Sequence, residues 1–295
     1  MKVSIGCVPI VWNNVDLPDL GPPVPYETVL DELARLGFEG TQYGRGFPLG
    51  AELRAALARR NLRLAEWYVS LPVTTDGLAD GAGAAARETL ARLTDAGGEV
   101  LCVAVDGTAA RDALSGRIDG AAPRWPDAAF EALAALLGEL ADEAPDGARV
   151  AFHPHMGSFV EAPVEVDTLA AALDGTRVGL CLDVGHYTVG GGDPVEAIGR
   201  FGRLIRHVHA KDVDPSVLAR LRSGEVGGMW AAIRARIFTE LGNGMLDLGG
   251  VVRALDGIGY DGWIMVEQDS SWLAPSEASE IGARALRAAM AEVGA

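Results

Sequence analysis

The chain has 295 residues, of which 49% are hydrophobic and 22% are charged, a composition typical of globular proteins. Its sequence contains no apolar run near the roughly 20 residues that a membrane span needs, so we expect no insertion into a membrane. The net charge of −16 argues against a nucleic-acid-binding protein, because such proteins normally present a basic face to the phosphates.

The amino-terminal residues predict a strand and not an export signal. The stretch MKVSIGCVPIVW lacks the charged, apolar and small-residue zones of a signal peptide, so we expect a cytoplasmic protein. Three cysteines, Cys7, Cys102 and Cys181, lie in apolar strand-like runs. Their odd number and wide spacing favour buried thiols over a disulfide framework or a thiolate metal site.

Strand-like and helix-like segments alternate along the whole chain. Short apolar runs predict strands at residues 3–8, 38–43, 62–70, 99–105, 149–152, 178–183, 204–210 and 263–269. Apolar residues at helical spacing predict helices at residues 26–36, 51–60, 83–96, 126–144, 163–173, 193–201, 245–259 and 275–292. Asp193, followed by Pro194 and Glu196, is a capped helix start.

Eight strand–helix units predict one TIM barrel of the (β/α)8 type over residues 1–295, with a doubly wound sheet as the main rival. The strands are apolar and do not alternate, as expected for parallel strands buried on both faces. A long excursion with helical segments interrupts the pattern after the seventh strand, at residues 213–246. In a barrel, residues that end the strands meet on one face. They are Asp16, Tyr43, Glu66, Asp106, His153, Asp183, His209 and Glu267.

All five histidines lie between Phe152 and Asp212, and the first 152 residues contain none. They fall in three segments, FHPHMGSFVE, CLDVGHY and HVHAKD, each of which follows a strand-like run. Histidine is the commonest metal ligand in proteins, and aspartates in the same segments add hard oxygen donors. The clustering therefore predicts a metal site at the strand ends.

Three strand ends offer the best candidate ligands. Asp183, His209 and Glu267 end the sixth, seventh and eighth strands, where a buried carboxylate is unfavourable unless it is paired or metal-bound. The fourth ligand is either His153 or Glu161, from the fifth strand and its loop. Oxygen and imidazole donors favour a divalent ion, Mn²⁺ or Co²⁺ first, with Mg²⁺ or Zn²⁺ as further candidates. Ordinary ion pairs and a hydrogen-bonded core histidine are the alternative interpretation.

The same segments supply candidates for proton transfer, namely His155, Glu161 and His186. His155 is expected to titrate near neutral pH, where a histidine works well as a general acid or base. His186 can also reach the pocket as a substrate contact or an additional ligand.

Candidate substrate contacts are Trp12, Tyr43, Glu66 and Lys211. Lys211 and Asp212 either orient substrate oxygens or pair with each other. His207 lies two residues before the ligand candidate of the same strand, so we expect it one layer deeper, where it would support the site.

These motifs resemble those of the xylose-isomerase-like TIM-barrel superfamily, which includes sugar phosphate isomerases and epimerases, and most closely the inosose (2-keto-myo-inositol) dehydratases. The resemblance runs through GCVPIVWNNVDLPDLG, FEGTQYGRGFP, HPHMGS, LDVGHY, HVHAKD, IFTELGNGMLDL and GWIMVEQD. It implies Asp183, His209 and Glu267 as metal ligands and residues 213–246 as a lid. The chain departs from the family in having His153 where many members have glutamate, and Glu66 where the dehydratases have lysine.

The resemblance implies a metal-dependent dehydratase, a lyase that acts on a keto-cyclitol or keto-sugar through an enediolate stabilised by the metal. A base from the fifth strand, His153, His155 or Glu161, would take the proton, and a protonated His155 or His186 would assist departure of the hydroxyl. The alternative is a ketose isomerase or epimerase, which reprotonates the same enediolate. The expected partner is a small polyol or keto-sugar, and a homo-oligomer is among the expected assemblies.

Overall fold

Eight parallel strands close into a barrel in the computed structural model, which describes residues 2–119 and 122–294. The barrel strands are β1 (Ser4–Cys7), β2 (Gly40–Gln42), β3 (Arg63–Leu71), β6 (Val100–Val105), β7 (Arg149–Phe152), β8 (Gly179–Asp183), β9 (Ile205–Ala210) and β12 (Trp263–Val266). They pair in the order β1-β12-β9-β8-β7-β6-β3-β2, and β1 also pairs with β2. The ring is therefore closed, which confirms the predicted TIM barrel and excludes the doubly wound sheet.

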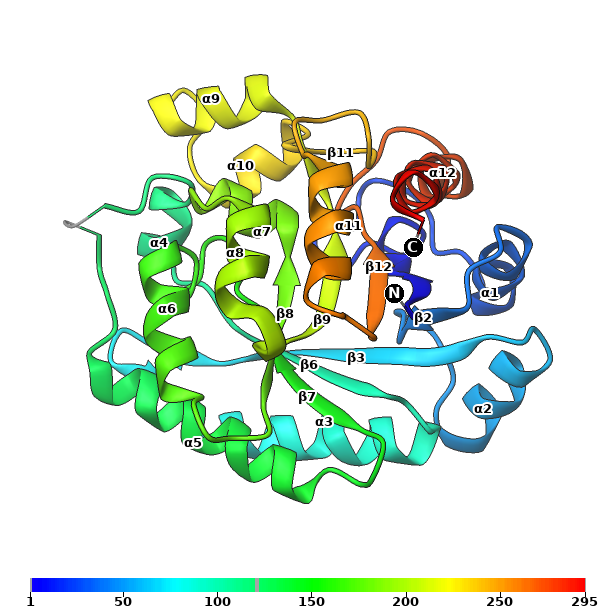
Figure 1. Ribbon diagram of the computed structural model, residues 1–295, viewed down its shortest axis with the longest axis horizontal. Coiled ribbons are helices and arrows are strands. Elements are labelled where there is room, and N and C mark those ends of the chain that lie inside the picture. Colours follow the sequence, from blue (N-terminus) through cyan, green and yellow to red (C-terminus); the bar gives the residue numbers. More distant parts are fainter. Residues whose placement is uncertain (1, 120–121, 295) are drawn as a thin grey trace.

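Helices connect the strands and pack on the outside of the barrel (Figure 1). They are α1 (Tyr26–Arg35), α2 (Gly50–Ala58), α3 (Ala82–Ala96), α5 (Asp127–Glu143), α6 (Pro163–Ala172), α8 (Pro194–Phe201), α11 (Leu248–Gly257) and α12 (Pro275–Val293). The predicted cap of α8 is confirmed, because the Asp193 side chain accepts hydrogen bonds from the amides of Val195 and Glu196.

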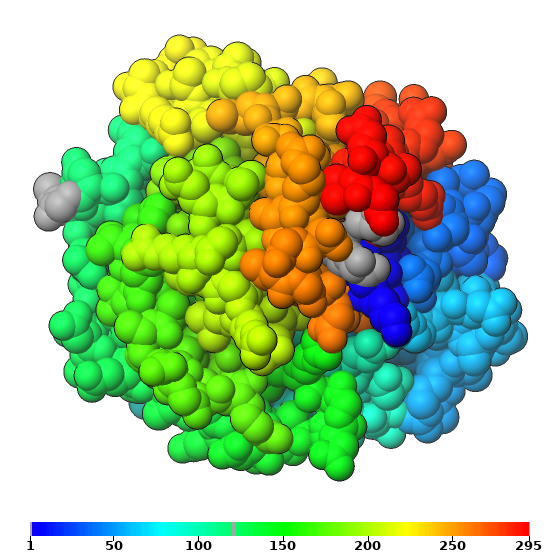
Figure 2. Space-filling model, viewed as in Figure 1, coloured from blue at the N-terminus to red at the C-terminus, as the bar shows by residue number. Residues whose placement is uncertain are grey.

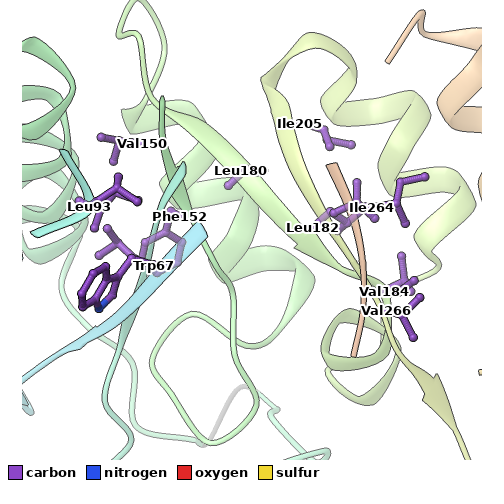
Figure 3. Close-up of a cluster of buried hydrophobic side chains, with 14 of the residues drawn as sticks. Trp67, Leu93, Val150, Phe152, Leu180, Leu182, Val184, Ile205, Ile264 and Val266 are labelled. Carbon is purple, nitrogen blue, oxygen red and sulfur yellow. The ribbon is translucent and has the colours of Figure 1, made fainter. Parts of the chain in front are cut away.

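Apolar side chains lie on both faces of the strands, as parallel strands require. The larger cluster lies between strands and helices, and Figure 3 shows part of it, including Phe152 and Leu182. A smaller cluster uses the alternate strand positions, among them Cys102, Ala151 and Cys181, and fills the barrel interior. The free cysteines are buried, as predicted.

The excursion after β9 folds into a small substructure. It holds β10 (Asp212–Val213), α9 (Pro215–Ser223), α10 (Met229–Arg234) and β11 (Phe238–Thr239), and β10 pairs antiparallel with β11. Figure 1 shows α9 and α10 in yellow at one edge of the barrel, and the same segment projects from that edge in Figure 2. Its buried residues, such as Leu221, Ile233 and Phe238, form a second apolar cluster with residues from elsewhere in the chain, Leu17, Met156 and Val189.

Several short elements were not predicted. They are α4 (Ala109–Leu114), α7 (Val184–Val189), the hairpin of β4 (Val73–Thr74) and β5 (Gly77–Leu78), and 3-10 turns at Pro9–Val11 and Gly202–Leu204. Helices this short have too few periodic positions to stand out in a sequence and depend on tertiary contacts. In the described part of the chain, the helices are too short or too polar to cross a membrane.

Candidate active site

A cavity of about 280 Å³ opens at the carboxyl ends of the barrel strands. Its polar lining consists of Asp16, Gln42, Tyr68, Ser70, Asp106, His155, Glu267 and Asp269. Apolar side chains from the strands and loops complete the wall, together with Met229, Trp230 and Ile233 of α10. The excursion after β9 therefore forms part of the cavity, although it lies far from the other lining residues in the sequence.

Four side chains converge beside this cavity: His153, Asp183, His209 and Glu267. Their candidate ligand atoms all lie within 4.8 Å of one another, and all four residues are buried. The Nε2 of His153 lies 3.5 Å from Asp183 Oδ2. The Nδ1 of His209 lies 3.8 Å from the same oxygen and 2.6 Å from Glu267 Oε2. The barrel thus brings together the ends of four strands, β7, β8, β9 and β12.

The polar atoms of this group fit a bound cation. Asp183 Oδ2, His209 Nδ1 and Glu267 Oε2 are buried and have no hydrogen-bond partner within residues 2–119 and 122–294. Buried lone pairs that face one another without a shared proton are unfavourable unless a positive charge lies between them. Two imidazoles and two carboxylates are a donor set suited to Mn²⁺, Co²⁺ or Zn²⁺.

Lys211 places a positive charge next to the group. Its Nζ lies 2.7 Å from Asp269 Oδ1, and 3.3 Å from both Asp183 Oδ2 and Glu267 Oε1. Burial would lower the pKa of Lys211, but the carboxylates of Asp183, Asp269 and Glu267 raise it well above its ordinary value. The ammonium group therefore remains charged and balances part of the surrounding negative charge.

Asp212 does not pair with Lys211, so the structure excludes the ion pair that was one of the two interpretations of these residues. Its Oδ2 accepts hydrogen bonds from the amides of Gly242 and Gly244, at 2.9 and 3.0 Å. Its Oδ1 accepts from Leu246 at 3.0 Å. Asp212 therefore fastens the end of the excursion to β10, and Lys211 is free to face the carboxylate group.

Glu66 lies inside the barrel, away from the predicted substrate-binding position. It is fully buried, and its Oε2 accepts a hydrogen bond from His209 Nε2 at 2.9 Å and lies 2.7 Å from His207 Nε2. Burial would raise the pKa of Glu66, but His209 and His207 hold it well below its ordinary value. Glu66 thus contacts the side of His209 opposite Glu267, and His207 lies in the deeper layer expected for it.

His155 and His186 pack against each other beside the metal-ligand group, with ring centroids 3.9 Å apart and ring planes tilted by 40°. Burial lowers the pKa of His155 to about 3, and the neighbouring His153 contributes to the shift. Burial also lowers the pKa of His186. These pKa shifts run against the prediction of a histidine that titrates near neutrality, although His186 is buried and His155 lies half-buried at the cavity wall.

The tautomer of His155 follows from one contact. Its Nδ1 lies 2.7 Å from the carbonyl oxygen of Met156, which can only accept, so Nδ1 carries the proton. The neutral ring then has its lone pair on Nε2. His186 Nε2, in turn, lies 2.9 Å from Lys211 Nζ.

Glu161 lies outside the group of candidate ligands, with both oxygens engaged. Oε1 accepts from the amide of Gly116 at 2.6 Å and from the hydroxyl of Ser115 at 3.2 Å, and Oε2 accepts from the amide of Gly157 at 2.5 Å. Burial raises the pKa of Glu161 to about 7. The residue fastens the loop after β7 to the end of α4.

Trp12 is packed in the core and Tyr43 lies half-buried against it, and neither residue lines the cavity. The indole Nε1 of Trp12 donates to Glu32 at 2.5 Å. Tyr43 stacks on Trp67 with ring centroids 3.7 Å apart, and its hydroxyl donates to the Phe47 carbonyl at 2.9 Å. The polar groups of both side chains are therefore already hydrogen-bonded within the protein and do not contact the cavity.

Asp269 is a candidate functional residue that the sequence reasoning did not single out. It lines the cavity and is buried, and its Oδ1 pairs with Lys211. Its Oδ2 has no hydrogen-bond partner in the described part of the chain. The sequence feature that could have identified Asp269 is its position two residues after Glu267, because residues two apart in an extended segment have their side chains on the same face.

Comparison with known proteins agrees with this architecture. The family model described as xylose isomerase-like TIM barrel matches residues 21–289. An inosose dehydratase of Clostridium botulinum is 32% identical over 283 residues, which cover 94% of this chain and 93% of the relative. The rhizopine catabolism protein MocC of Rhizobium meliloti is 35% identical over 293 residues, covering 96% and 87%. The solved structure of the IOLI protein with a zinc atom has a TM-score of 0.71 at 14% identity, covering 99% of both chains. Sequence and fold together show that the chain belongs to the xylose isomerase-like TIM barrel family.

Proposed function

We propose that the protein is a metal-dependent lyase that removes water from a keto-cyclitol or keto-sugar such as 2-keto-myo-inositol. The observation that carries this proposal is the convergence of His153, Asp183, His209 and Glu267 beside a cavity of about 280 Å³, with unpartnered buried lone pairs. The similarity to relatives named inosose dehydratase, over nearly the whole chain, supports the choice of reaction.

The cavity suits an uncharged polyhydroxy ketone. Four carboxylates line it, from Asp16, Asp106, Glu267 and Asp269, and no lysine or arginine of the described ranges does so. Carboxylates accept hydrogen bonds from hydroxyl groups but repel phosphate and carboxylate groups. A neutral keto-cyclitol or keto-sugar therefore fits this lining better than a sugar phosphate.

Each residue has a separate role in the proposed reaction. His153, Asp183, His209 and Glu267 would hold the metal ion, which when bound acts as a Lewis acid on the ketone oxygen and stabilises the enediolate. His155 would take the proton from the carbon next to the ketone, because its neutral ring has Nε2 as the free acceptor at the cavity wall. Its lowered pKa keeps the ring unprotonated but makes it a weak base, so the transfer would depend on the acidity that the bound metal gives to the carbon.

Asp269 would contact the hydroxyl that leaves. Its Oδ2 is available at the cavity wall, and its Oδ1 is fixed by Lys211 at 2.7 Å. Burial raises the pKa of Asp269 to about 7, so its carboxyl group would donate a proton to the hydroxyl, which leaves as water. The ammonium group of Lys211 would then stabilise the carboxylate that remains. Glu161, with both oxygens already bonded to the scaffold, has no part in this scheme.

Metal analysis combined with an ultraviolet assay tests the proposal. Protein loaded with Mn²⁺ or Co²⁺ should convert 2-keto-myo-inositol to a dehydrated product that absorbs in the ultraviolet, and EDTA should stop the reaction. Asp183→Asn and Glu267→Gln should lose metal and activity together. Asp193→Asn is the matched control, because asparagine caps α8 as well as aspartate does. Turnover that is unaffected by EDTA would contradict the proposal.

The same assay separates dehydration from epimerisation. A ketose isomerase or epimerase removes the same proton but returns one, so deuterium from the solvent would enter the substrate without a rise in absorbance. That result would keep the metal site and replace the lyase by an isomerase.

A further inference from the structure

The ring of His209 lies between two carboxylates. On the side of the candidate metal ligands, its Nδ1 lies 2.6 Å from Glu267 Oε2. On the side of the barrel interior, its Nε2 hydrogen bonds to Glu66 Oε2 at 2.9 Å. Glu66 and His209 are both buried, at 0% and 1% exposure, so water does not compete for this hydrogen bond.

The contact with Glu66 decides which nitrogen of His209 carries the proton. Glu66 meets His209 Nε2 with a carboxylate oxygen at 2.9 Å, and a carboxylate oxygen accepts hydrogen bonds. Nε2 must therefore donate. An imidazole that binds a metal ion is neutral and has one such proton, so with the ion bound Nδ1 would keep the lone pair that faces Asp183 Oδ2 and Glu267 Oε2.

We propose that Glu66 is a positioning residue for the metal site, which holds the proton of His209 on Nε2 so that Nδ1 faces the metal ion. Carboxylates that bond the outer nitrogen of a metal-binding histidine fix its orientation and increase its basicity. This inference rests on the proposed metal site. It assigns Glu66 to the orientation of the metal ligand His209 instead of the predicted contact with the substrate.

A local irregularity in the barrel turns Glu66 inward. The pairing of β2 with β3 shifts from Thr41 opposite Leu64 to Gln42 opposite Glu66, which inserts one extra residue in β3. Leu64 belongs to the outer apolar cluster. In a regular strand, residues two apart share a face, so Glu66 would point outward with Leu64. The bulge places its carboxylate beside His209 instead.

Glu66, His207 and His209 also offer donor atoms within 4.8 Å of one another. The rival role for Glu66 is therefore that of a ligand to a second ion, and the test must count the ions bound per chain.

Cobalt affinity tests the positioning role, measured by competition with a chromophoric chelator. Glu66→Ala should bind Co²⁺ about 10- to 100-fold more weakly than the wild type. Glu66→Gln should lose less, because its amide oxygen can still accept the Nε2 proton. His207→Gln is the matched control: it removes the other neighbour of Glu66, keeps the bond to His209, and should leave the affinity within about 3-fold of the wild type.

The spectrum of bound Co²⁺ separates positioning from a structural role. In Glu66→Ala the visible absorption bands should shift because the imidazole reorients, whereas a structural role would lower the melting temperature of the metal-free protein and leave the bands unchanged. In zinc-loaded protein labelled with ¹⁵N-histidine, the proton of His209 should be on Nε2. A proton on Nδ1 would overturn the inference.

The outcomes for metal binding distinguish this inference from the proposed function. One metal ion per wild-type chain with unchanged affinity in Glu66→Ala overturns the positioning role alone. Two ions that fall to one in Glu66→Ala also overturn it, because Glu66 would then be a ligand itself. A wild-type protein that binds no metal overturns the proposed function and this inference together.

Discussion

Arg111 and Glu165 form a fully buried ion pair that supports the loop after β7. The two guanidinium Nη atoms of Arg111 each lie 2.8 Å from a carboxylate oxygen of Glu165. Arg111 also donates to the carbonyl oxygens of Ser158, at 2.7 Å, and Pro123, at 2.9 Å. The pair therefore joins α4, the start of α6 and the loop that carries His155.

We expect Arg111→Met to lower the free energy of unfolding by about 3 to 5 kcal/mol, because the Glu165 carboxylate would stay buried without its counter-ion. The amides of Glu161 and Ala162 still donate to that carboxylate, at 3.0 and 2.9 Å, which favours the lower end of this range. With an unfolding entropy of about 2 cal/mol/K per residue, the melting temperature should fall by about 5 to 8 °C.

Differential scanning calorimetry checks this prediction, and an exposed pair of similar geometry is the control. Arg234 contacts both oxygens of Asp19, at 3.0 and 3.1 Å, but the two side chains are largely exposed. Arg234→Met should leave the melting temperature unchanged. The double variant Arg111→Met with Glu165→Leu should recover much of the lost stability. If Arg111→Met alone has the melting temperature of the wild type, burial does not determine how much the Arg111–Glu165 pair contributes to stability.

Two further predictions concern pH and substrate binding. The pKa of Glu161 rises in the folded protein from its usual 4.5 to about 7 through burial, so the folded state binds the proton more tightly than the unfolded state. Its contribution to stability is full below pH 4.5 and is lost as the pH rises through 7. Relative to Glu161→Gln, the wild type should therefore lose roughly 2 to 3 kcal/mol between pH 5 and 8 in urea titrations, and a constant difference would contradict this. Trp230→Ala should raise KM for 2-keto-myo-inositol about 10-fold with little change in kcat, because the indole lines the cavity and offers no candidate metal ligand or proton-transfer group; an equal fall in kcat would place the ring at the reacting atoms.

The sequence was sufficient for the fold and for the main ligand candidates. Parallel strands buried on both faces leave a clear apolar signal, and eight of them with intervening helices close into one barrel. In that fold, the residues that end the strands must meet, so Asp183, His209 and Glu267 could be placed together from their positions alone. His153 joins them in the structure for the same reason.

The tertiary structure decided which side chains face the cavity and which support it. Glu66 turns inward because of a bulge between β2 and β3, and such an irregularity leaves no mark in the pattern of apolar residues. Tyr43 ends a predicted strand, but its ring packs against the core, and Trp12 lies within the core, where aromatic surface is buried.

The proton-transfer groups depend even more on three-dimensional environment. Glu161 and Asp269 both follow strand ends, yet one is bonded to a distant helix end and the other faces the cavity. His155 was predicted to titrate near neutral pH, but desolvation and the neighbouring His153 lower its pKa to about 3. Position in a strand is local information, whereas desolvation and charge pairing are set by residues distant in the sequence, and these determine the chemistry of each group.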